Sequence, residues 1–392
     1  MLLGNIFIFL SYCLKHEKKV VSKKMTYKVF DFFSGCGGFS KGFELAGFDI
    51  VFANDIWEKA SITYKKNHPN TPFLLKDIKS LSSKDISKVY NGSPDVIIGG
   101  PPCQGFSLAG LRKIDDERNE LYKEYVRMVA SFKPKMFVME NVPGLVKRAN
   151  GYFFEKIKSD FMEIGYNVEC KILKAADFGV PQIRQRAFFI GSLNNEFPIN
   201  FPTPTHYDPF ETTLFSEGMN KYVTLGNAIS DLPLLPDSDY LGDEIQEYVS
   251  LPQNEYQAFM RENSYAIYNH IATNHNEKTR EIIALVPEGK NFKSLPEEFK
   301  ETRKFNVAFT RLDSKVPSHT VDTGHRHHFH PWQNRVPTVR ESARIQSFSD
   351  DFIFLGTKTS QYTQVGNAVP PLLAKVVGKS VLSSLKKVTI NA

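Results

Sequence analysis

The 392-residue sequence predicts an α/β fold, a mostly parallel sheet covered by helices, with a smaller and irregular second lobe. Between residues 28 and 191, short apolar runs alternate with longer amphipathic ones, which is typical of βαβ units. After residue 191 the chain becomes rich in Pro, Asn and Thr, and its periodicity breaks. The length also exceeds the roughly 250–300 residues at which a single core stops growing, so we expect two lobes.

The apolar runs of the first lobe predict strands, and the amphipathic segments between them predict helices. A Gly at position 47 is a typical helix end. We expect strands at residues 28–33, 49–55, 95–100, 136–141 and 187–192, a short strand before Asp77, and helices at 38–47, 120–132 and 153–165.

The later chain returns to regular periodicity twice, in "TVRESARIQSF" and in "QVGNAVPPLLAKVVGKSVLSSL", which we interpret as a loop followed by a helix. We therefore divide the chain into residues 25–192, 193–337, 338–360 and 361–392. Residues 1–24 carry an apolar run that is followed, not preceded, by lysines and is shorter than a membrane span of about 20 residues. We expect a dispensable extension, with Met25 as an alternative start; a weak partner-binding or membrane-surface segment is the alternative.

The composition, with 41% hydrophobic and 23% charged residues, is that of a soluble globular protein. The four cysteines have no paired spacing, so neither a disulfide framework nor a zinc site is indicated, and a reducing cytoplasm fits best. The net charge is +6, and residues 300–344 hold nine Lys/Arg against four Asp/Glu. This local excess points to a polyanionic partner.

A glycine-rich turn, "DFFSGCGG" at residues 31–38, ends the first strand and opens a helix. Glycines there allow a ligand to approach the backbone, and the helix N-terminus offers free N–H groups; a tight turn without a ligand is the alternative. Asp55 and Asp77 follow the next two strands, where carboxylates can bind ribose hydroxyls and an adenine amino group. The spacing is not that of a dinucleotide or phosphate loop, so an adenosine compound such as S-adenosylmethionine fits, unless both residues only cap helices.

The turn "GGPPCQGFS" places Cys103 behind two prolines at the carboxyl end of a predicted strand. Prolines leave such a turn few conformations, and this sheet edge is where α/β proteins bind ligands, which favours a nucleophile over a buried core thiol. Glu140 ends the neighbouring predicted strand. It is either a proton carrier beside the thiol or a helix cap or solvated charge.

The segment "QIRQR" at residues 182–186 carries two arginines two positions apart. If the segment is extended, Arg184 and Arg186 point to one side and can hold a phosphate or a reacting base. A charged edge strand that discourages pairing is the alternative.

Six segments in this order, "DFFSGCGGFSKGFELAGF", "GGPPCQGFS", "MENVPGL", "QIRQR", "RESARIQSF" and "QVGNAVPPLLA", resemble the motif set of cytosine-C5 DNA methyltransferases. The resemblance covers residues 28 to about 379, apart from residues 193–337. It implies a Rossmann-like, S-adenosylmethionine-dependent methyltransferase sheet and a smaller target-recognition domain that reads base edges in the major groove. It also implies that residues 338–360 organise that domain and that residues 361–392 return to the catalytic domain.

The resemblance implies covalent catalysis on a flipped-out cytosine. Cys103 would attack ring position 6, Glu140 would contact N3 and the amino group, and Arg184 would hold the carbonyl oxygen, with Arg186 beside it. The methyl group would pass from S-adenosylmethionine to C5, under a loop at residues 105–120.

The family's cofactor pocket maps onto several segments of this chain, and no metal is implied. Many relatives carry Glu-Trp where this chain has Asp55-Ile56, with Trp57 one place later, which leaves adenine stacking by Ile56 less secure than ribose binding by Asp55. The cofactor-binding residues carried over are Phe33, Gly35, Gly38, Asp55, Ile56, Asp77, Ile78, Pro102, Leu121, Asn367 and Ala368.

The implied partner is double-stranded DNA, in a cytoplasmic, nucleoid-associated and monomeric enzyme that protects host DNA beside a restriction endonuclease. The alternatives are a tRNA cytosine-C5 methyltransferase, a nucleotide-dependent oxidoreductase and a non-catalytic DNA-binding protein. A histidine cluster at residues 325–330, which includes Arg326, is expected to contact phosphates and bases or to pack locally rather than to bind a metal.

Overall fold

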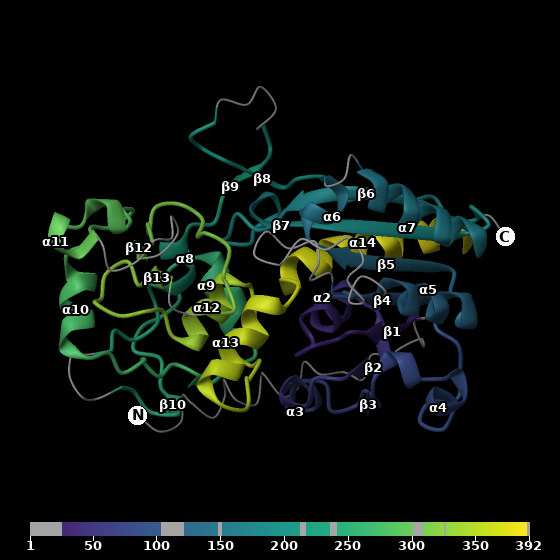
Figure 1. Ribbon diagram of the computed structural model, residues 1–392, viewed down its shortest axis with the longest axis horizontal. Helices are drawn as coiled ribbons and strands as arrows, with labels where there is room; N and C mark the ends of the chain where they lie inside the picture. Colours follow the sequence, from purple (N-terminus) through teal and green to yellow (C-terminus); the bar gives the residue numbers. More distant parts are fainter. Residues whose placement is uncertain are drawn as a thin grey trace, which may run out of the picture.

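The computed structural model describes residues 26–102, 121–147, 151–211, 217–235, 241–300, 309–324 and 327–389. Its main feature is a seven-stranded sheet of order β3-β2-β1-β4-β5-β7-β6, in which β7 runs antiparallel to β5 and β6 (Figure 1). The strands are β1 (Lys28–Phe32), β2 (Asp49–Asp55), β3 (Phe73–Leu75), β4 (Val96–Gly99), β5 (Met136–Asn141), β6 (Tyr166–Lys174) and β7 (Gln185–Leu193). The predicted α/β class is confirmed, and β6 is a strand that was not among those predicted.

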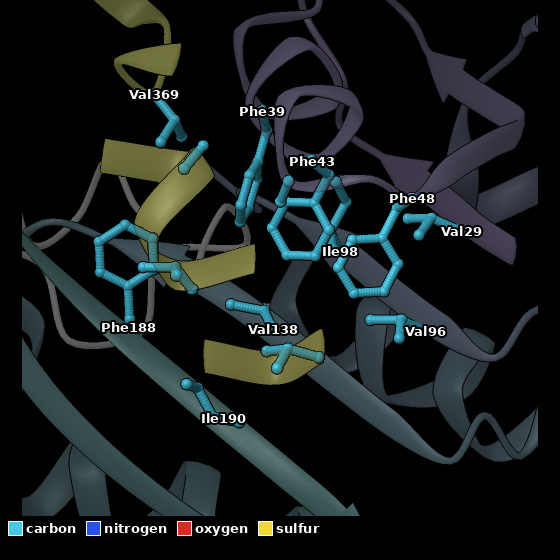
Figure 2. Close-up of a cluster of buried hydrophobic side chains, with 14 of the residues drawn as sticks. Val29, Phe39, Phe43, Phe48, Val96, Ile98, Val138, Phe188, Ile190 and Val369 are labelled. Atoms are coloured by element: carbon cyan, nitrogen blue, oxygen red, sulfur yellow. The ribbon is translucent and has the colours of Figure 1, made fainter. Parts of the chain in front are cut away.

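Helices cover both faces of this sheet because its strands are apolar on both sides. On one face, Val29, Val96, Ile98 and Val138 pack under α2 (Gly38–Ala46) and α14 (Pro371–Thr389) (Figure 2). On the other face, Phe30, Ile97 and Phe137 pack under α5 (Leu121–Phe132) and α7 (Tyr152–Glu163). The helices of this part are α2 (Gly38–Ala46), α3 (Glu58–Asn67), α4 (Ser83–Ser87), α5 (Leu121–Phe132), α6 (Pro143–Lys147) and α7 (Tyr152–Glu163), together with the 3₁₀ turns η1 (Ile78–Ser80) and η5 (Ala175–Phe178).

Residues 193–337, called the second region below, contain short elements only. Each of its strands in the described part is two residues long, and they pair in three separate two-stranded sheets. Figure 1 shows this region beside the sheet, at the other end of the molecule from α7. Its elements are β8 (His206–Tyr207), β9 (Asn220–Lys221), α8 (Leu225–Ile229), β10 (Ile245–Gln246), α9 (Glu255–Arg261), β11 (Ile267–Tyr268), α10 (Glu277–Ala284), η6 (Phe292–Ser294), α11 (Glu297–Lys300), β12 (Thr310–Arg311) and β13 (His328–Phe329).

The C-terminal part runs from the second region back to the sheet through α12 (Val339–Ile345), α13 (Lys358–Asn367) and α14 (Pro371–Thr389). The prediction of a loop at "QVGNAVPP" is wrong for its first half, because Gln364 to Asn367 complete the last turn of α13. Helix α14 lies directly on α2. A Cβ on Gly42 would lie 2.2 Å from the Cβ of Ala374, so only glycine permits this approach.

The stretch Lys358–Val388 is apolar and long enough to cross a membrane by composition. More than half of the most apolar part of this stretch is buried inside the protein, and Leu373, Val377 and Val381 belong to the core over the sheet. Its apolarity is therefore accounted for by packing against α2.

Candidate active site

A cavity of about 620 Å³ opens at the carboxyl ends of the central strands. It lies beside the neighbouring strands β1 and β4, where the chain leaving β1 leads to β2 on one side and the chain leaving β4 leads to β5 on the other. This is where open α/β sheets bind ligands. Every predicted site residue in the described part of the chain lines it, while Cys103 lies outside the described residues. These lining residues are Phe33, Gly35, Gly38, Asp55, Ile56, Asp77, Ile78, Pro102, Leu121, Glu140, Arg184, Arg186, Asn367 and Ala368.

Asp55 organises the glycine turn at one end of the cavity. Its Oδ2 accepts from the backbone N–H of Gly35 at 2.7 Å, and its Oδ1 accepts from that of Trp57 at 2.7 Å. Phe33 adopts a φ of 58°, which is strained for a residue with a side chain and is held by this arrangement. Each carboxylate oxygen keeps a further acceptor site, so a ribose hydroxyl remains within the chemistry of this group.

A buried carboxyl group, that of Asp31, lies between the end of β1 and the first turn of α2, next to the same glycine turn. Asp31 is fully buried, and its Oδ2 accepts from the Ser40 hydroxyl at 2.6 Å, which in turn lies 2.8 Å from the Tyr64 hydroxyl. Burial raises the pKa of Asp31 to about 8. The carboxyl under the turn is therefore mostly protonated at neutral pH.

The next wall combines a helix cap with an exposed apolar side chain. The Oδ1 of Asp77 accepts from the N–H of Lys79 at 2.9 Å. Asp77 therefore caps the turn η1, in agreement with the alternative that it is a helix cap. Ile56 is 64% exposed although it is apolar, and Trp57 lines the cavity beside it. These two side chains offer an apolar surface to a flat ring.

At the other end of the cavity, Glu140 and Arg186 form an ion pair, with Arg186 Nε 2.8 Å from Glu140 Oε1 and both side chains about 85% buried. Burial raises the pKa of Glu140, opposed by the charges of Arg186 and Arg184. A carboxyl whose pKa is raised takes up or shares a proton more readily than an exposed one. Asn141, the next residue, donates from Nδ2 to the carbonyl of Pro101 at 3.0 Å and fixes the turn that leads to position 103.

Arg184 lines the same cavity but has different partners. Its Nη1 donates to the carbonyl of Val321 at 3.3 Å and its Nη2 to that of Gly366 at 2.9 Å, while Nε has no acceptor among the described residues. The two arginines therefore differ, since only Arg186 pairs with Glu140.

Two glutamines near the cavity were missed by the sequence reasoning. Gln182 donates to Gln346, whose own Nε2 donates to the carbonyls of Val365 at 3.0 Å and Ala368 at 2.7 Å. Both lie inside the motifs quoted above, so the motif positions themselves were the available signal.

The histidine cluster separates into unrelated environments, with His325 and Arg326 outside the described residues. His330 Nδ1 accepts from the N–H groups of Trp332 and Gln333, and its Nε2 lies 3.4 Å from Glu341. His328 stacks on His319 with ring centroids 5.8 Å apart, and burial lowers its pKa to about 4. No group of three or more His, Cys, Asp or Glu side chains placed to hold a metal ion occurs in the described ranges.

Comparison with known proteins covers nearly the whole chain. The profile of the C-5 cytosine-specific DNA methylase family matches residues 27–383. The Type II methyltransferase M.DdeI of Desulfomicrobium norvegicum is 40% identical over 90% of this chain and 88% of its own length, and M1.HphI of Haemophilus parahaemolyticus is 39% identical over 97% and 94%.

A solved structure agrees with these sequence matches. The crystal structure of a prophage-encoded DNA modification methyltransferase from E. coli superposes with a TM-score of 0.75 and 29% identity, covering 92% of this chain and all of the other. The chain belongs to the C-5 cytosine-specific DNA methylase family, and it is a DNA (cytosine-5-)-methyltransferase.

Proposed function

We propose that the cavity binds S-adenosylmethionine at the glycine turn and a flipped-out cytosine at the Glu140–Arg186 pair, with Cys103 as the nucleophile. The observation that carries this proposal is that residues from eight separate chain segments line one cavity, with an acidic and apolar end at Asp55 and Ile56 and a charged end at Glu140 and Arg186. A methyl donor and its acceptor base need adjacent sites of these two kinds.

The proposed reaction begins when the Cys103 thiolate forms a bond to C6 of the cytosine. Glu140 supplies a proton or hydrogen bond at N3, which draws electron density from the ring. S-adenosylmethionine, when bound, would supply the methyl group to C5 and leave as S-adenosylhomocysteine. Transfer of the C5 proton to water, return of the N3 proton to Glu140 and departure of the Cys103 sulfur from C6 as a thiolate then restore the aromatic base. Two guanidiniums beside one carboxylate leave net positive charge in the cavity, which favours a nearby thiolate over a thiol.

Arg186 is the arginine that we assign to the base, in place of the expectation that Arg184 holds its carbonyl oxygen. Arg186 already contacts Glu140, so a base on Glu140 lies within its reach. Both Nη groups of Arg184 are engaged by backbone carbonyls.

The second region is assigned to target recognition on duplex DNA, joined to the catalytic sheet by residues 338–360. The matched relatives M.DdeI and M1.HphI are Type II methyltransferases, which supports a role in a restriction–modification system with a partner endonuclease. We further propose that the enzyme is a monomer and acts in the cytoplasm, where its DNA substrate lies.

The test is bisulfite sequencing of DNA from a methylation-free host that expresses either the intact chain or the Cys103→Ala variant. Protected cytosines in one short context, with the intact chain only, are the expected result and define the recognition site. Methylation by the Cys103→Ala variant would contradict the assigned nucleophile. Incorporation of labelled methyl groups into tRNA but not into duplex DNA would contradict the substrate.

A further inference from the structure

Arg184 connects two parts of the protein that are far apart in the sequence. Its side chain is almost fully buried, with 1% exposed. One carbonyl that it binds, that of Val321, belongs to the second region, whereas the other, that of Gly366, belongs to the end of α13. The two residues that follow Gly366, Asn367 and Ala368, line the cavity.

Residues 318–322, the segment around Val321, are also fixed to the segment that carries Arg184. Ile183 N–H donates to the carbonyl of Ser318 at 2.9 Å, and Ser318 N–H donates to that of Pro181 at 2.9 Å. Val321 N–H donates to the side-chain oxygen of Gln182 at 2.9 Å. These bonds form a short parallel connection between the second region and the edge of the catalytic site.

The end of α13 touches residues 318–322 directly. A Cβ placed on Gly366 would lie 2.5 Å from the carbonyl oxygen of Asp322, so the two backbones are in contact. This helix is held from its other side by Gln346, which binds the carbonyls of Val365 and Ala368. The second region and the cofactor end of the cavity therefore meet at Arg184.

A buried guanidinium that loses one of these carbonyls is left with an unpaired donor, which is costly in an interior without water. The positions of Val321 and Gly366 are therefore linked through one rigid, planar group. We propose that Arg184 is a positioning residue that makes DNA binding by the second region and cofactor binding in the cavity strengthen one another. This inference rests on the proposed function, in that it takes the second region as the DNA-binding part.

The test measures binding of S-adenosylhomocysteine by calorimetry, with and without a duplex that carries the site found by bisulfite sequencing. In the wild type, we expect the duplex to tighten S-adenosylhomocysteine binding by about 5- to 150-fold, the usual range for coupled sites. We call the ratio of the two S-adenosylhomocysteine affinities, with and without the duplex, the coupling factor. In Arg184→Met this factor should fall to between about one and two, while the S-adenosylhomocysteine affinity measured without DNA changes by less than about threefold. Arg184→Lys, which keeps a donor, should recover part of the factor.

The matched control is Arg340→Met. Arg340 is also a buried arginine that binds backbone carbonyls, among them those of Ser349 and Phe352, but it lies outside the second region and does not line the cavity. We expect this variant to lose stability and keep the wild-type factor. Gly366→Ala disturbs the contact between α13 and Asp322 without removing Arg184, and it should also lower the coupling factor. This second variant tests the inference if Arg184→Met fails to fold.

Three outcomes overturn the inference. The first is a wild-type enzyme that methylates DNA but binds its two ligands independently. The second is a normal factor in folded Arg184→Met and Gly366→Ala, and the third is a variant that loses only kcat, which indicates direct contact with the base. Absence of methylation by the intact chain would instead count against the proposed function.

Discussion

The catalytic sheet and the second region are stabilised in different ways. The sheet is held by two continuous apolar clusters, and its strands run for up to nine residues. The second region has two-residue strands and, where it meets α12, an interior that contains charged side chains. Arg344 is fully buried and binds Asp350 through two parallel hydrogen bonds and Asp231 at 2.8 Å.

This difference shows how a region with little regular structure can still be held in one conformation. Aliphatic packing is not directional and needs large, regular surfaces, which a sheet and its helices provide. Hydrogen-bonded ion pairs have fixed geometry, so a few of them position irregular segments, although breaking one leaves a buried charge. Substitutions in the sheet should therefore act through volume or chemistry, and substitutions at the junction with the second region through charge.

The largest effect is expected at the chemical centre of the sheet. Glu140→Gln keeps the size of the side chain but removes the proton that it transfers, so kcat should fall by about 10²–10⁴-fold, with little change in DNA affinity. The variant also leaves the buried Arg186 without a charged partner, so its melting temperature should fall, and rates are compared below that temperature. Single-turnover methyl transfer measures the change. Glu169→Gln, an exposed glutamate on β6 of the same sheet, is the matched control and should retain full activity. A Glu140→Gln enzyme with more than a tenth of the wild-type rate would exclude the proposed proton transfer.

The buried ion pairs should give the largest change in stability. Arg344→Met removes the arginine that joins Asp231 and Asp350 and leaves them with the more distant Arg261 and Arg340. We expect a loss of about 3–5 kcal/mol in the free energy of unfolding. Ile98→Val in the sheet should lose only about 0.5–1.5 kcal/mol. Denaturant titration of both variants gives the comparison. Equal losses would mean that the two parts are stabilised alike.

The stability of the catalytic sheet should depend on pH through the buried carboxyl of Asp31. The folded chain keeps the Asp31 proton up to a pKa of about 8, whereas the unfolded chain loses it near 3.8. The stability linked to this neutral group is complete below about pH 4 and is lost as the pH rises toward 8.

Asp31→Asn removes this titration, so its melting temperature relative to wild type should rise by about 5–10 °C between pH 5 and pH 8. Scanning calorimetry at both values measures the difference. Asp49→Asn, an exposed aspartate at the start of β2, is the control and should show no such trend. A constant difference between Asp31→Asn and wild type would mean that Asp31 titrates normally.

The smallest effect is expected at the apolar wall of the cavity. Ile56→Ala removes part of the surface that we assign to the adenine, and S-adenosylhomocysteine should bind about 3- to 10-fold more weakly, consistent with roughly 1 kcal/mol of lost burial. Trp57→Ala, measured in the same way, shows which of the two neighbours carries the contact. Unchanged affinity in both variants would place the adenine elsewhere.

Much of the fold was predictable because the sheet repeats one local rule. Short continuous apolar runs in β1, β4 and β5 and the glycine that ends α2 each carry their own signal, and the structure confirms these elements. Strand β6 was not predicted, although "YNVECKI" alternates apolar and polar residues, the pattern of a strand with one face against the core. The end of α13 was missed because Gly366 and the following Pro370 indicate a loop, while the close contact with Asp322 that needs this glycine is tertiary.

The candidate site shows the same limit. Motif positions predicted which residues line the cavity, but the partners of Arg184 and Arg186 differ although the two residues are equivalent in the local pattern. Their difference depends on Val321 and Gly366, which lie more than 130 positions away in the chain. Local sequence cannot supply contacts of that range.

The packing of α14 on α2 has a consequence for how the protein is made. During synthesis, the sheet and α2 leave the ribosome long before α14, and the apolar face around Phe43 stays uncovered until the last helix emerges. Contacts across more than 300 residues also form slowly. A chain that stops early lacks both this cover and the Asn367–Ala368 side of the cavity, so incomplete products should be inactive and prone to aggregation.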